Sequence, residues 1–186
     1  MTDRSVLVTG GRGKLGSELA KRFPMAVTPS RQELDLTGSP DEIARFIRAH
    51  PTEIVIHAAA MTNVRQCEDA RDLAWATNVA GTANLLKACA RAVPDVYFVY
   101  VSTACVFDGE RGMYTENDTP HPKNFYALTK LAAECIVSTH ERHLIVRTNF
   151  VAREPWPYPK AFVDRFGTYL FAEDVAAGVA DVVNAG

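Results

Sequence analysis

The stretch Val6-Leu7-Val8-Thr9-Gly10-Gly11-Arg12-Gly13-Lys14-Leu15-Gly16-Ser17-Glu18-Leu19 places a glycine cluster between an apolar run and a helical pattern. The cluster can be parsed as G-x-G-x-x-G over Gly11, Gly13 and Gly16, or as G-x-x-G-x-x-G beginning at Gly10. Glycines let the backbone turn tightly and approach a pyrophosphate, whose charge is stabilised by the N–H groups at the helix N-terminus. The stretch therefore predicts a dinucleotide-binding loop, and the alternative is a glycine-rich turn without a ligand.

Short apolar runs alternate with helical patterns along the chain. We predict strands at residues 5–9, 26–28, 53–56, 96–101, 144–146 and 168–171, and helices at 14–22, 40–50, 73–92, 125–140 and 174–184. Ser39 is predicted to cap the helix that Pro40 begins, and the proline-rich residues 153–160 are predicted to be a loop. Repeated strand–helix units without hairpin turns predict an α/β fold, a doubly wound parallel sheet of the Rossmann type.

Length and composition indicate one globular domain over residues 1–186, of which 47% are hydrophobic. With 20 basic and 22 acidic residues, the chain shows no electrostatic footprint for a nucleic acid. The 4 cysteines are scattered, which argues against a metal site or a disulfide framework and favours a reducing compartment. No apolar stretch approaches the roughly 20 residues of a membrane span. We therefore expect no signal peptide, no membrane partner and a cytoplasmic location.

The end of the second predicted strand affects the choice of dinucleotide. An acidic residue about 20 positions beyond the fingerprint would bind the ribose hydroxyls of NAD, but the chain has Thr28-Pro29-Ser30-Arg31 there, and Glu33 and Asp35 come later. Arg31 can instead bind a 2′-phosphate through two hydrogen bonds, or it can be a solvated surface arginine. This pattern favours NADP and leaves NAD open.

Tyr126-Ala127-Leu128-Thr129-Lys130 forms a Y-x-x-x-K motif within a predicted helix. Positions i and i+4 lie on one helix face, so we expect the Lys130 ammonium beside the Tyr126 phenol. A nearby cation lowers the pKa of tyrosine from about 10 towards neutrality, where proton transfer is most effective. Ser102 and Thr103 end a predicted parallel strand, where such sheets bind ligands, and a hydroxyl there can donate to a substrate carbonyl.

Several motifs follow one another in a recognisable order. They are Gly10/Gly13/Gly16, His57-Ala58-Ala59-Ala60, Asn78-Val79-x-Gly81-Thr82-x-Asn84-Leu85-Leu86, Ser102-Thr103, Tyr126-x-x-x-Lys130-Leu131-x-x-Glu134 and Arg147-Thr148. In this order the chain resembles the extended short-chain dehydrogenases/reductases over nearly its whole length. Within that family it is most similar to the dTDP-4-dehydrorhamnose reductases.

This resemblance implies the roles of individual residues. Tyr126 would protonate a 4-keto oxygen as hydride arrives from the nicotinamide, Lys130 would lower the tyrosine pKa and hold the nicotinamide ribose, and Thr103 would polarise the carbonyl. The residues expected to contact NADP or NAD are Gly10, Gly11, Arg12, Gly13, Lys14, Leu15, Gly16, Arg31, Asp35, Leu36, Ala58, Ala59, Ala60, Thr62, Ser102, Tyr126 and Lys130. The implied substrate is a nucleotide sugar.

The chain departs from the family pattern in two places. Ala104-Cys105 follows Ser102-Thr103 where the family usually has Asp-Tyr, so substrate contacts are expected to differ. The C-terminal substrate lobe is reduced, and residues 147–186 would contribute only a minimal substrate-side segment. In that segment Trp156 and Tyr158 can either stack on a base or sugar or pack onto the domain edge.

Three functions remain open from the sequence. The first is an NAD(P)H-dependent reductase of a 4-keto-sugar nucleotide, the second a sugar-nucleotide epimerase or dehydratase of the same superfamily, and the third a non-catalytic dinucleotide-binding regulatory subunit. Asn78 can either hold buried backbone or take part in catalysis, and His57 is expected to satisfy backbone groups. The resemblance also implies that two copies can pair through two long helices as a homodimer.

Overall fold

The fold is built on a parallel sheet in which sequence neighbours are also spatial neighbours. A computed structural model describes residues 4–155 and 167–185. Four strands pair in the order β1 (Val6–Thr9), β2 (Ile54–His57), β3 (Tyr97–Thr103) and β4 (His143–Thr148), all parallel. Their carboxyl ends therefore meet along one edge of the sheet, where ligands of this architecture bind.

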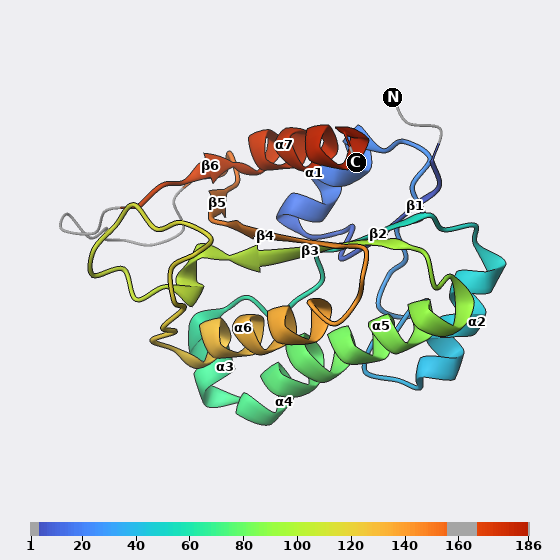
Figure 1. Cartoon of the computed structure of the whole chain (residues 1–186), viewed down its shortest axis with the longest axis horizontal. Helices are drawn as coiled ribbons and strands as arrows, with labels where there is room; N and C mark the ends of the chain where they lie inside the picture. The colour runs from blue at the N-terminus through green and yellow to red at the C-terminus, as the bar shows by residue number, and fades with distance from the viewer. Residues whose placement is uncertain (1–3, 156–166, 186) are drawn as a thin grey trace.

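Helices cover both faces of this sheet (Figure 1). On one face lie α1 (Lys14–Arg22) and α7 (Ala172–Ala185), and on the other lie α2 (Pro40–Ala49), α5 (Gly81–Ala92) and α6 (Phe125–Val137). Successive strand residues point to opposite faces, so each strand supplies two hydrophobic cores. The predicted doubly wound α/β fold is confirmed in these layers.

The division between the two cores is visible in β1 and β3. Val6 and Val8 of β1 pack with Leu15 and Leu19 of α1, whereas Leu7 packs with the helices of the other face. In β3 the same alternation sends Val99 and Val101 to one side and Phe98 and Tyr100 to the other. Both faces are thus buried, which explains why the strands have continuous apolar runs instead of alternating with polar residues.

The predicted strand at residues 26–28 is wrong in extent. Only a single bridge, between Val27 and Leu7, forms there, held by Val8 N–H to Val27 O and Val27 N–H to Val6 O at 2.9 Å each. The segment stops after this bridge because Pro29 follows closely and cannot donate a further ladder hydrogen bond. It still lies beside β1 on the side away from β2. The strand order therefore switches sides at β1, and in sheets of this kind a crevice lies at the carboxyl ends of the strands at such a point.

The helix predicted over residues 73–92 is helical throughout, but it contains a π-helical turn that was not predicted. Here α4 (Arg71–Trp75) passes through a π-helical turn, Ala76–Ala80, before α5 begins at Gly81. A separate helix, α3 (Val64–Asp69), precedes them and was not predicted. The other predicted helices agree closely with the structure, and Ser39 caps α2 by accepting a hydrogen bond from Asp41 N at 3.2 Å.

The C-terminal segment forms a small second sheet before it rejoins the fold. β5 (Phe150–Val151) was not predicted and pairs in parallel with β6 (Leu170–Phe171), which is shorter than the predicted strand at 168–171. Trp156 and Tyr158, and with them most of the predicted loop at 153–160, lie outside the described residues. In the part of the chain that is described, no helix has the length and apolarity needed to cross a membrane.

Candidate functional site

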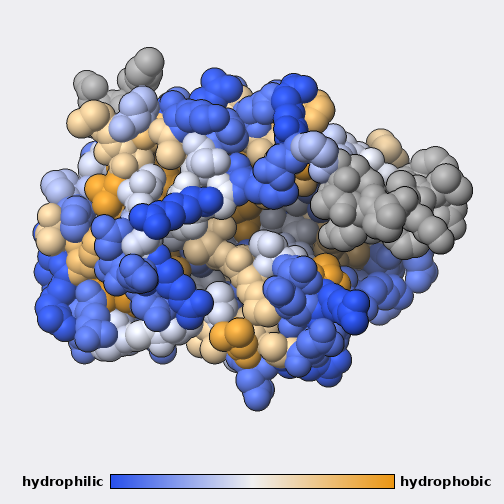
Figure 2. All heavy atoms as spheres, turned by 180° about the vertical axis from the view of Figure 1, so that it is seen from behind, coloured by the Kyte–Doolittle hydropathy of each residue, from blue (hydrophilic) through white to orange (hydrophobic). Residues whose placement is uncertain are grey.

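A cleft of about 1280 Å³ lies at the carboxyl ends of the strands. It is lined by the glycine loop, the segments after β2 and β3, the first turns of α6 and the chain after β4. All candidate site residues line it: Gly10, Gly11, Arg12, Gly13, Lys14, Leu15, Gly16, Arg31, Asp35, Leu36, Ala58, Ala59, Ala60, Thr62, Ser102, Thr103, Tyr126 and Lys130. Figure 2 shows the back of the molecule, where a central band of pale and apolar residues is surrounded by hydrophilic ones.

The glycine loop uses glycines of both parses, because a Cβ on Gly11 would also clash, at 2.7 Å from Thr28 Cβ. Gly10 has a φ of +74°, and a Cβ on it would lie 2.8 Å from the backbone of Ala59. A Cβ on Gly16 would lie 2.0 Å from the carbonyl oxygen of Gly10. Gly13 N–H donates to that same carbonyl at 2.8 Å, which closes the turn at the start of α1. The loop therefore brings backbone and the helix N-terminus to the cleft as an anion cradle requires.

Charged side chains surround the far end of this cradle. Arg31 is exposed, with its Nε 3.9 Å from a carboxylate oxygen of Asp35. Hydrogen bonds from the side chain and backbone of Thr37 lower the pKa of Asp35. Hydrogen bonds from Ser30 lower the pKa of Glu33, and Arg12 adds a smaller effect in the same direction. Arg12 and Arg31 thus line the cleft, each near one acidic side chain, Glu33 and Asp35 respectively.

Thr103 and Tyr126 come together at the other end of the cleft. Thr103, the last residue of β3, accepts a hydrogen bond from Cys105 N at 3.1 Å, and its hydroxyl lies 3.4 Å from Asn149 Oδ1. Tyr126 sits in the first turn of α6, which Asn124 caps through the backbone N–H of Ala127. The strand end and the helix start therefore present two hydroxyls to the same part of the cleft.

The prediction that Lys130 lowers the pKa of Tyr126 is wrong in this structure. Burial and the neighbouring Cys105 raise the pKa of Tyr126 to about 12, although a hydrogen bond with Thr103 acts in the opposite direction. Lys130 Nζ donates instead to Val101 O at 2.8 Å and lies 4.0 Å from the centre of the Tyr100 ring. Burial lowers the pKa of Lys130 to about 7. Tyr126 is accordingly a protonated phenol at neutral pH.

Asn78 holds backbone, the structural one of its two predicted roles. Its side chain accepts from Met61 N at 2.7 Å and donates to Met61 O and to Thr129 Oγ1 at 3.0 Å each. Thr129 in turn donates to the carbonyl of Tyr126 at 2.7 Å. One amide in the π-turn therefore connects the chain after β2 to the helix that carries Tyr126.

His57 does not pair with backbone as expected. Its ring bridges two hydroxyls, with Nδ1 2.6 Å from Thr9 Oγ1 and Nε2 2.9 Å from Thr82 Oγ1. Because Thr82 donates its own proton to Asn78 O, it accepts from Nε2–H, so Nδ1 is the acceptor for Thr9. The ring links β1, β2 and α5 directly beneath the cleft.

Sequence reasoning missed Asn149 and the environment of Glu134. Asn149 lines the cleft and offers its side-chain oxygen to the Thr103 hydroxyl and, at 3.9 Å, to the Cys105 thiol. Its place directly after a parallel strand was the available indication, the same one that identified Thr103. Glu134 was noted only as part of a motif, although it is buried and paired with Arg147.

Comparisons with known proteins agree with this geometry. Residues 4–184 match the family described as RmlD substrate binding domain. A dTDP-4-dehydrorhamnose reductase of Burkholderia thailandensis is 34% identical over 94% of this chain and 64% of its own length. The methionine adenosyltransferase 2 subunit beta of Rattus norvegicus is 31% identical over 70% of this chain and 42% of its own length.

Solved structures give the same result. The dTDP-4-dehydrorhamnose reductase of Bacillus anthracis, described in complex with NADP, superposes with a TM-score of 0.85 at 27% identity, over 99% of this chain and 72% of that one. The chain spans less than two thirds of the length of the curated relatives named above. By its fold and its sequence, this chain belongs to the RmlD substrate binding domain family, within the extended short-chain dehydrogenases/reductases.

Proposed function

We propose that this chain is an NADP-dependent reductase of a 4-keto-sugar nucleotide. The observation that carries the proposal is the joint placement of a glycine cradle and the Thr103, Tyr126 and Lys130 side chains in one cleft. A cradle alone supports binding, whereas hydroxyl, phenol and ammonium groups beside it support carbonyl chemistry. The reductases among the relatives point to the same reaction.

The cleft fits a dinucleotide. The positions of Gly10 and Gly16 leave no room for a Cβ against neighbouring backbone, so the loop is held in a tight turn whose N–H groups would face a pyrophosphate. Arg12 and Arg31 would pair with a 2′-phosphate at the adenosine end, which favours NADP over NAD. When bound, the cofactor supplies the hydride that reduces the carbonyl. Ala58, Ala59 and Ala60 would line its path, with Thr62 at the edge.

The chain's own residues would supply the proton and the polarisation. Burial raises the pKa of Tyr126 to about 12, so at neutral pH the phenol carries the proton that a keto oxygen needs as hydride arrives. Thr103 would turn its hydroxyl proton from Asn149 Oδ1 to the same oxygen and donate a hydrogen bond there. Lys130 would hold the cofactor ribose and stabilise the tyrosinate left after proton transfer.

The test is calorimetric titration with NADPH and NADH, followed by NADPH oxidation with dTDP-4-dehydro-L-rhamnose. Tyr126→Phe is expected to keep NADPH affinity and to lose activity by a factor of about 100 or more. Tyr97→Phe, at the amino end of β3, is the matched control and should leave both unchanged. Full activity in Tyr126→Phe would refute the mechanism, and no NADPH binding would refute the cradle.

The two other functions are distinct outcomes of the same test. Binding without turnover of any sugar nucleotide, with stable copurification of a partner enzyme, would favour a non-catalytic subunit. The similarity to a methionine adenosyltransferase subunit gives that outcome a specific basis. Cofactor that copurifies and does not exchange would favour an epimerase or dehydratase.

We infer that residues 147–186 form the substrate side of the cleft. Asn149, Phe150 and Tyr169 line it together with the glycine loop. Leu170 and Phe171 present exposed apolar surface next to them. Lys14 of the glycine loop also pairs with Glu154 at 2.8 Å, which connects this segment to the cofactor end. Such a surface can stack against a sugar or base.

We further propose a cytoplasmic homodimer. Trp75 of α4 and Leu128 of α6 are 45% and 43% exposed on neighbouring helices, which suits a second copy. Light scattering on a sizing column should give twice the chain mass, and Leu128→Glu should shift the protein to monomer. A wild-type monomer at micromolar concentration would rule the dimer out.

A further inference from the structure

A buried ionic cluster lies directly behind the catalytic candidates. The Glu134 side chain on α6 is only 4% exposed, and its carboxylate pairs with Arg147 on β4. The guanidinium Nε donates to both carboxylate oxygens at 3.1 Å and Nη2 donates to one at 2.7 Å. Ser102 donates its hydroxyl to the same carboxylate. Every part of this carboxylate is therefore committed to a partner.

Lys130 lies one helical turn before Glu134 on the same face of α6. Its ammonium is buried, bonded to Val101 O and placed over the Tyr100 ring. Burial lowers the pKa of Lys130, and the charge of Glu134 acts against that fall. The Glu134 carboxylate thus interacts with two cations: it is hydrogen-bonded to Arg147, and its charge favours the ammonium form of Lys130.

The other titratable groups facing Lys130 carry no charge near neutral pH. His57 on β2 is buried, and its pKa is lowered to about 3, so its ring is neutral. Burial raises the pKa of Tyr100 on β3 and of Tyr126 on α6, so both phenols are protonated. Glu134 is accordingly the charge that opposes the effect of burial on Lys130, and Arg147 is the cation paired with that charge.

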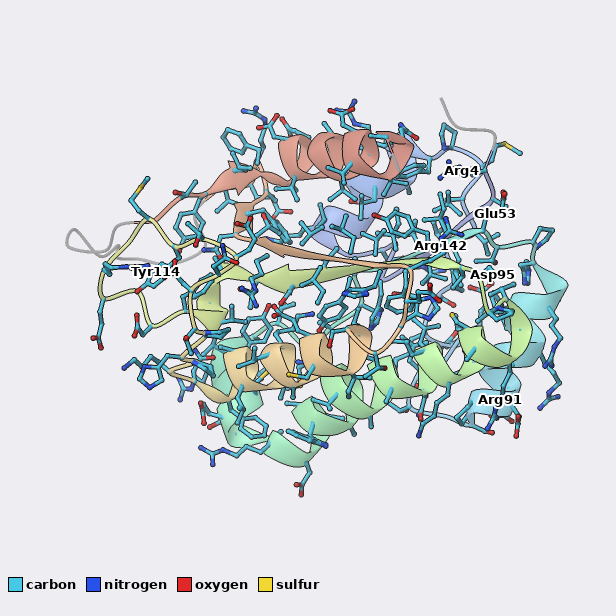
Figure 3. All side chains as sticks on the ribbon, in the orientation of Figure 1. Arg4, Glu53, Arg91, Asp95, Tyr114 and Arg142 are labelled. Atoms are coloured by element: carbon cyan, nitrogen blue, oxygen red, sulfur yellow. The ribbon has the colours of Figure 1, made fainter. Side chains whose placement is uncertain are left out.

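Aromatic rings cover the outer side of Arg147. Its guanidinium lies 5.1 Å from the centre of the Phe107 ring, and Phe107 stacks on Tyr114 with ring centres 4.6 Å apart. Figure 3 labels Tyr114 in the loop at the carboxyl end of the sheet, opposite Arg142. This stack covers part of the guanidinium, and the Glu134 side chain behind it is only 4% exposed, so the field of the carboxylate is screened less than at the surface.

We infer that Glu134 is a positioning residue that keeps Lys130 in its ammonium form in the cleft, and that Arg147 sets how strongly it does so. The hydrogen bond from Ser102 connects the same carboxylate to the end of β3, next to Thr103. The effect on turnover rests on the proposed reductase function, because there the ammonium must stabilise the tyrosinate. The effect on the protonation of Lys130 does not depend on it.

The cluster predicts opposite effects for its two members. Glu134→Gln removes the negative charge and leaves Lys130 facing the Arg147 cation alone, so the pKa of Lys130 should fall by about 1 unit. Arg147→Met leaves the carboxylate without its guanidinium partner, so the pKa of Lys130 should rise by about 1 unit. A purely structural role would give no such opposition in sign.

The experiment is an NMR titration of protein labelled with ¹³C at the lysine ε-carbons, with the Lys130 resonance identified by its loss in Lys130→Arg. A fall in Glu134→Gln and a rise in Arg147→Met would support the inference. Glu141→Gln, the same chemical change at an exposed position, should leave the Lys130 titration unchanged. Shifts of the same sign, or none, would overturn the inference.

A variant that fails to fold, or a wild-type protein without reductase activity, can be told apart from a failure of the inference. If Glu134→Gln does not fold, the Arg147→Met titration decides alone: a rise supports the inference, and no change or a fall overturns it. In active protein the alkaline limb of the kcat profile should follow the NMR shifts. If the shifts occur as expected but wild-type protein never oxidises NADPH, the positioning role stands and the proposed reductase function fails.

Discussion

Gly16 is the residue at which the cradle is most sensitive to substitution. A Cβ there would lie 2.0 Å from Gly10 O and 2.7 Å from Gly10 C, which are backbone atoms that cannot move away easily. Gly16→Ala is therefore expected to distort the loop and to weaken NADPH binding at least about tenfold, which corresponds to about 1.4 kcal/mol. Isothermal calorimetry measures this directly.

Gly178 provides the matched control. It lies in α7 with no atom within 4 Å of a built Cβ. Gly178→Ala should leave NADPH affinity unchanged and stabilise the protein by up to about 1 kcal/mol, because alanine favours a helix. Equal NADPH affinity in wild type and Gly16→Ala would show that the loop does not bind the pyrophosphate.

His57 makes the stability depend on pH. Burial, with a smaller effect of Lys130, lowers its folded-state pKa to about 3, against about 6.5 in an unfolded chain. The neutral ring is favoured by folding, so its contribution is fully present above pH 6.5 and is lost as the pH falls. At pH 4.5 the loss should be about 3 kcal/mol.

Urea unfolding of wild type and His57→Gln at pH 7.5 and pH 4.5 isolates this contribution. The other titratable groups are the same in both proteins, so the difference in the stability that the two proteins lose measures the contribution of His57. Wild type should lose more stability than His57→Gln on acidification, and parallel losses would contradict the assignment of a neutral buried ring.

At this scale the sequence predicts positions better than electrostatics. Motif spacing and strand ends were sufficient to bring all candidate residues to one cleft. The pKa of Tyr126 was predicted in the wrong direction because spacing does not reveal that Lys130 bonds to Val101 O. Nor does spacing show that burial dominates at the phenol.

At the scale of elements, the π-turn between α4 and α5 is the feature that organises the site. It carries Asn78, whose amide satisfies both backbone groups of Met61 and the Thr129 hydroxyl. Asn78→Ala leaves the Met61 N–H without its partner and takes one of two partners from Met61 O and from the Thr129 hydroxyl, so it should destabilise the protein by about 2 kcal/mol. NADPH affinity should fall as well, since Ala58, Ala59 and Ala60 line the cleft just before Met61.

Chemical denaturation and calorimetry test this prediction together. Asn117→Ala, at an exposed position in the loop before α6, should change stability by less than about 0.5 kcal/mol. An Asn78→Ala protein as stable as wild type would mean that the turn is held by packing alone.

Element boundaries show why part of the fold was not predictable. Each hydrogen bond of a π-turn spans one residue more than in an α-helix, and the apolar pattern of residues 73–92 fits both. What selects the π-turn is the contact of Asn78 with chain segments far away in sequence. The β5–β6 pair was missed for a similar reason, because two-residue strands carry no periodicity of their own.

At the scale of the whole molecule, the C-terminal segment serves the fold as well as the cleft. After β4 the chain passes through β5 and β6, and α7 then returns to cover one face of the main sheet beside α1 (Figure 1). Its buried residues join Val6, Val8, Val99 and Val101 in one core. Without α7 that core would face water, so the helix is required for the nucleotide-binding fold itself.

Val179 and Val182 test this requirement within one helix. Val179 is 3% exposed and packs in the core, whereas Val182 is 49% exposed. Val179→Ala should cost about 2 kcal/mol through lost burial and a cavity, and Val182→Ala less than about 0.5 kcal/mol. Thermal and urea unfolding give both values.

A chain ending before Ala172 should fail to fold, because each valine of α7 that it loses contributes about 1.5–3 kcal/mol to a total of about 5–15 kcal/mol. A truncated chain with native circular dichroism and cooperative unfolding would instead show that α7 is not needed for folding, and that the sheet and the remaining helices form the cleft without it.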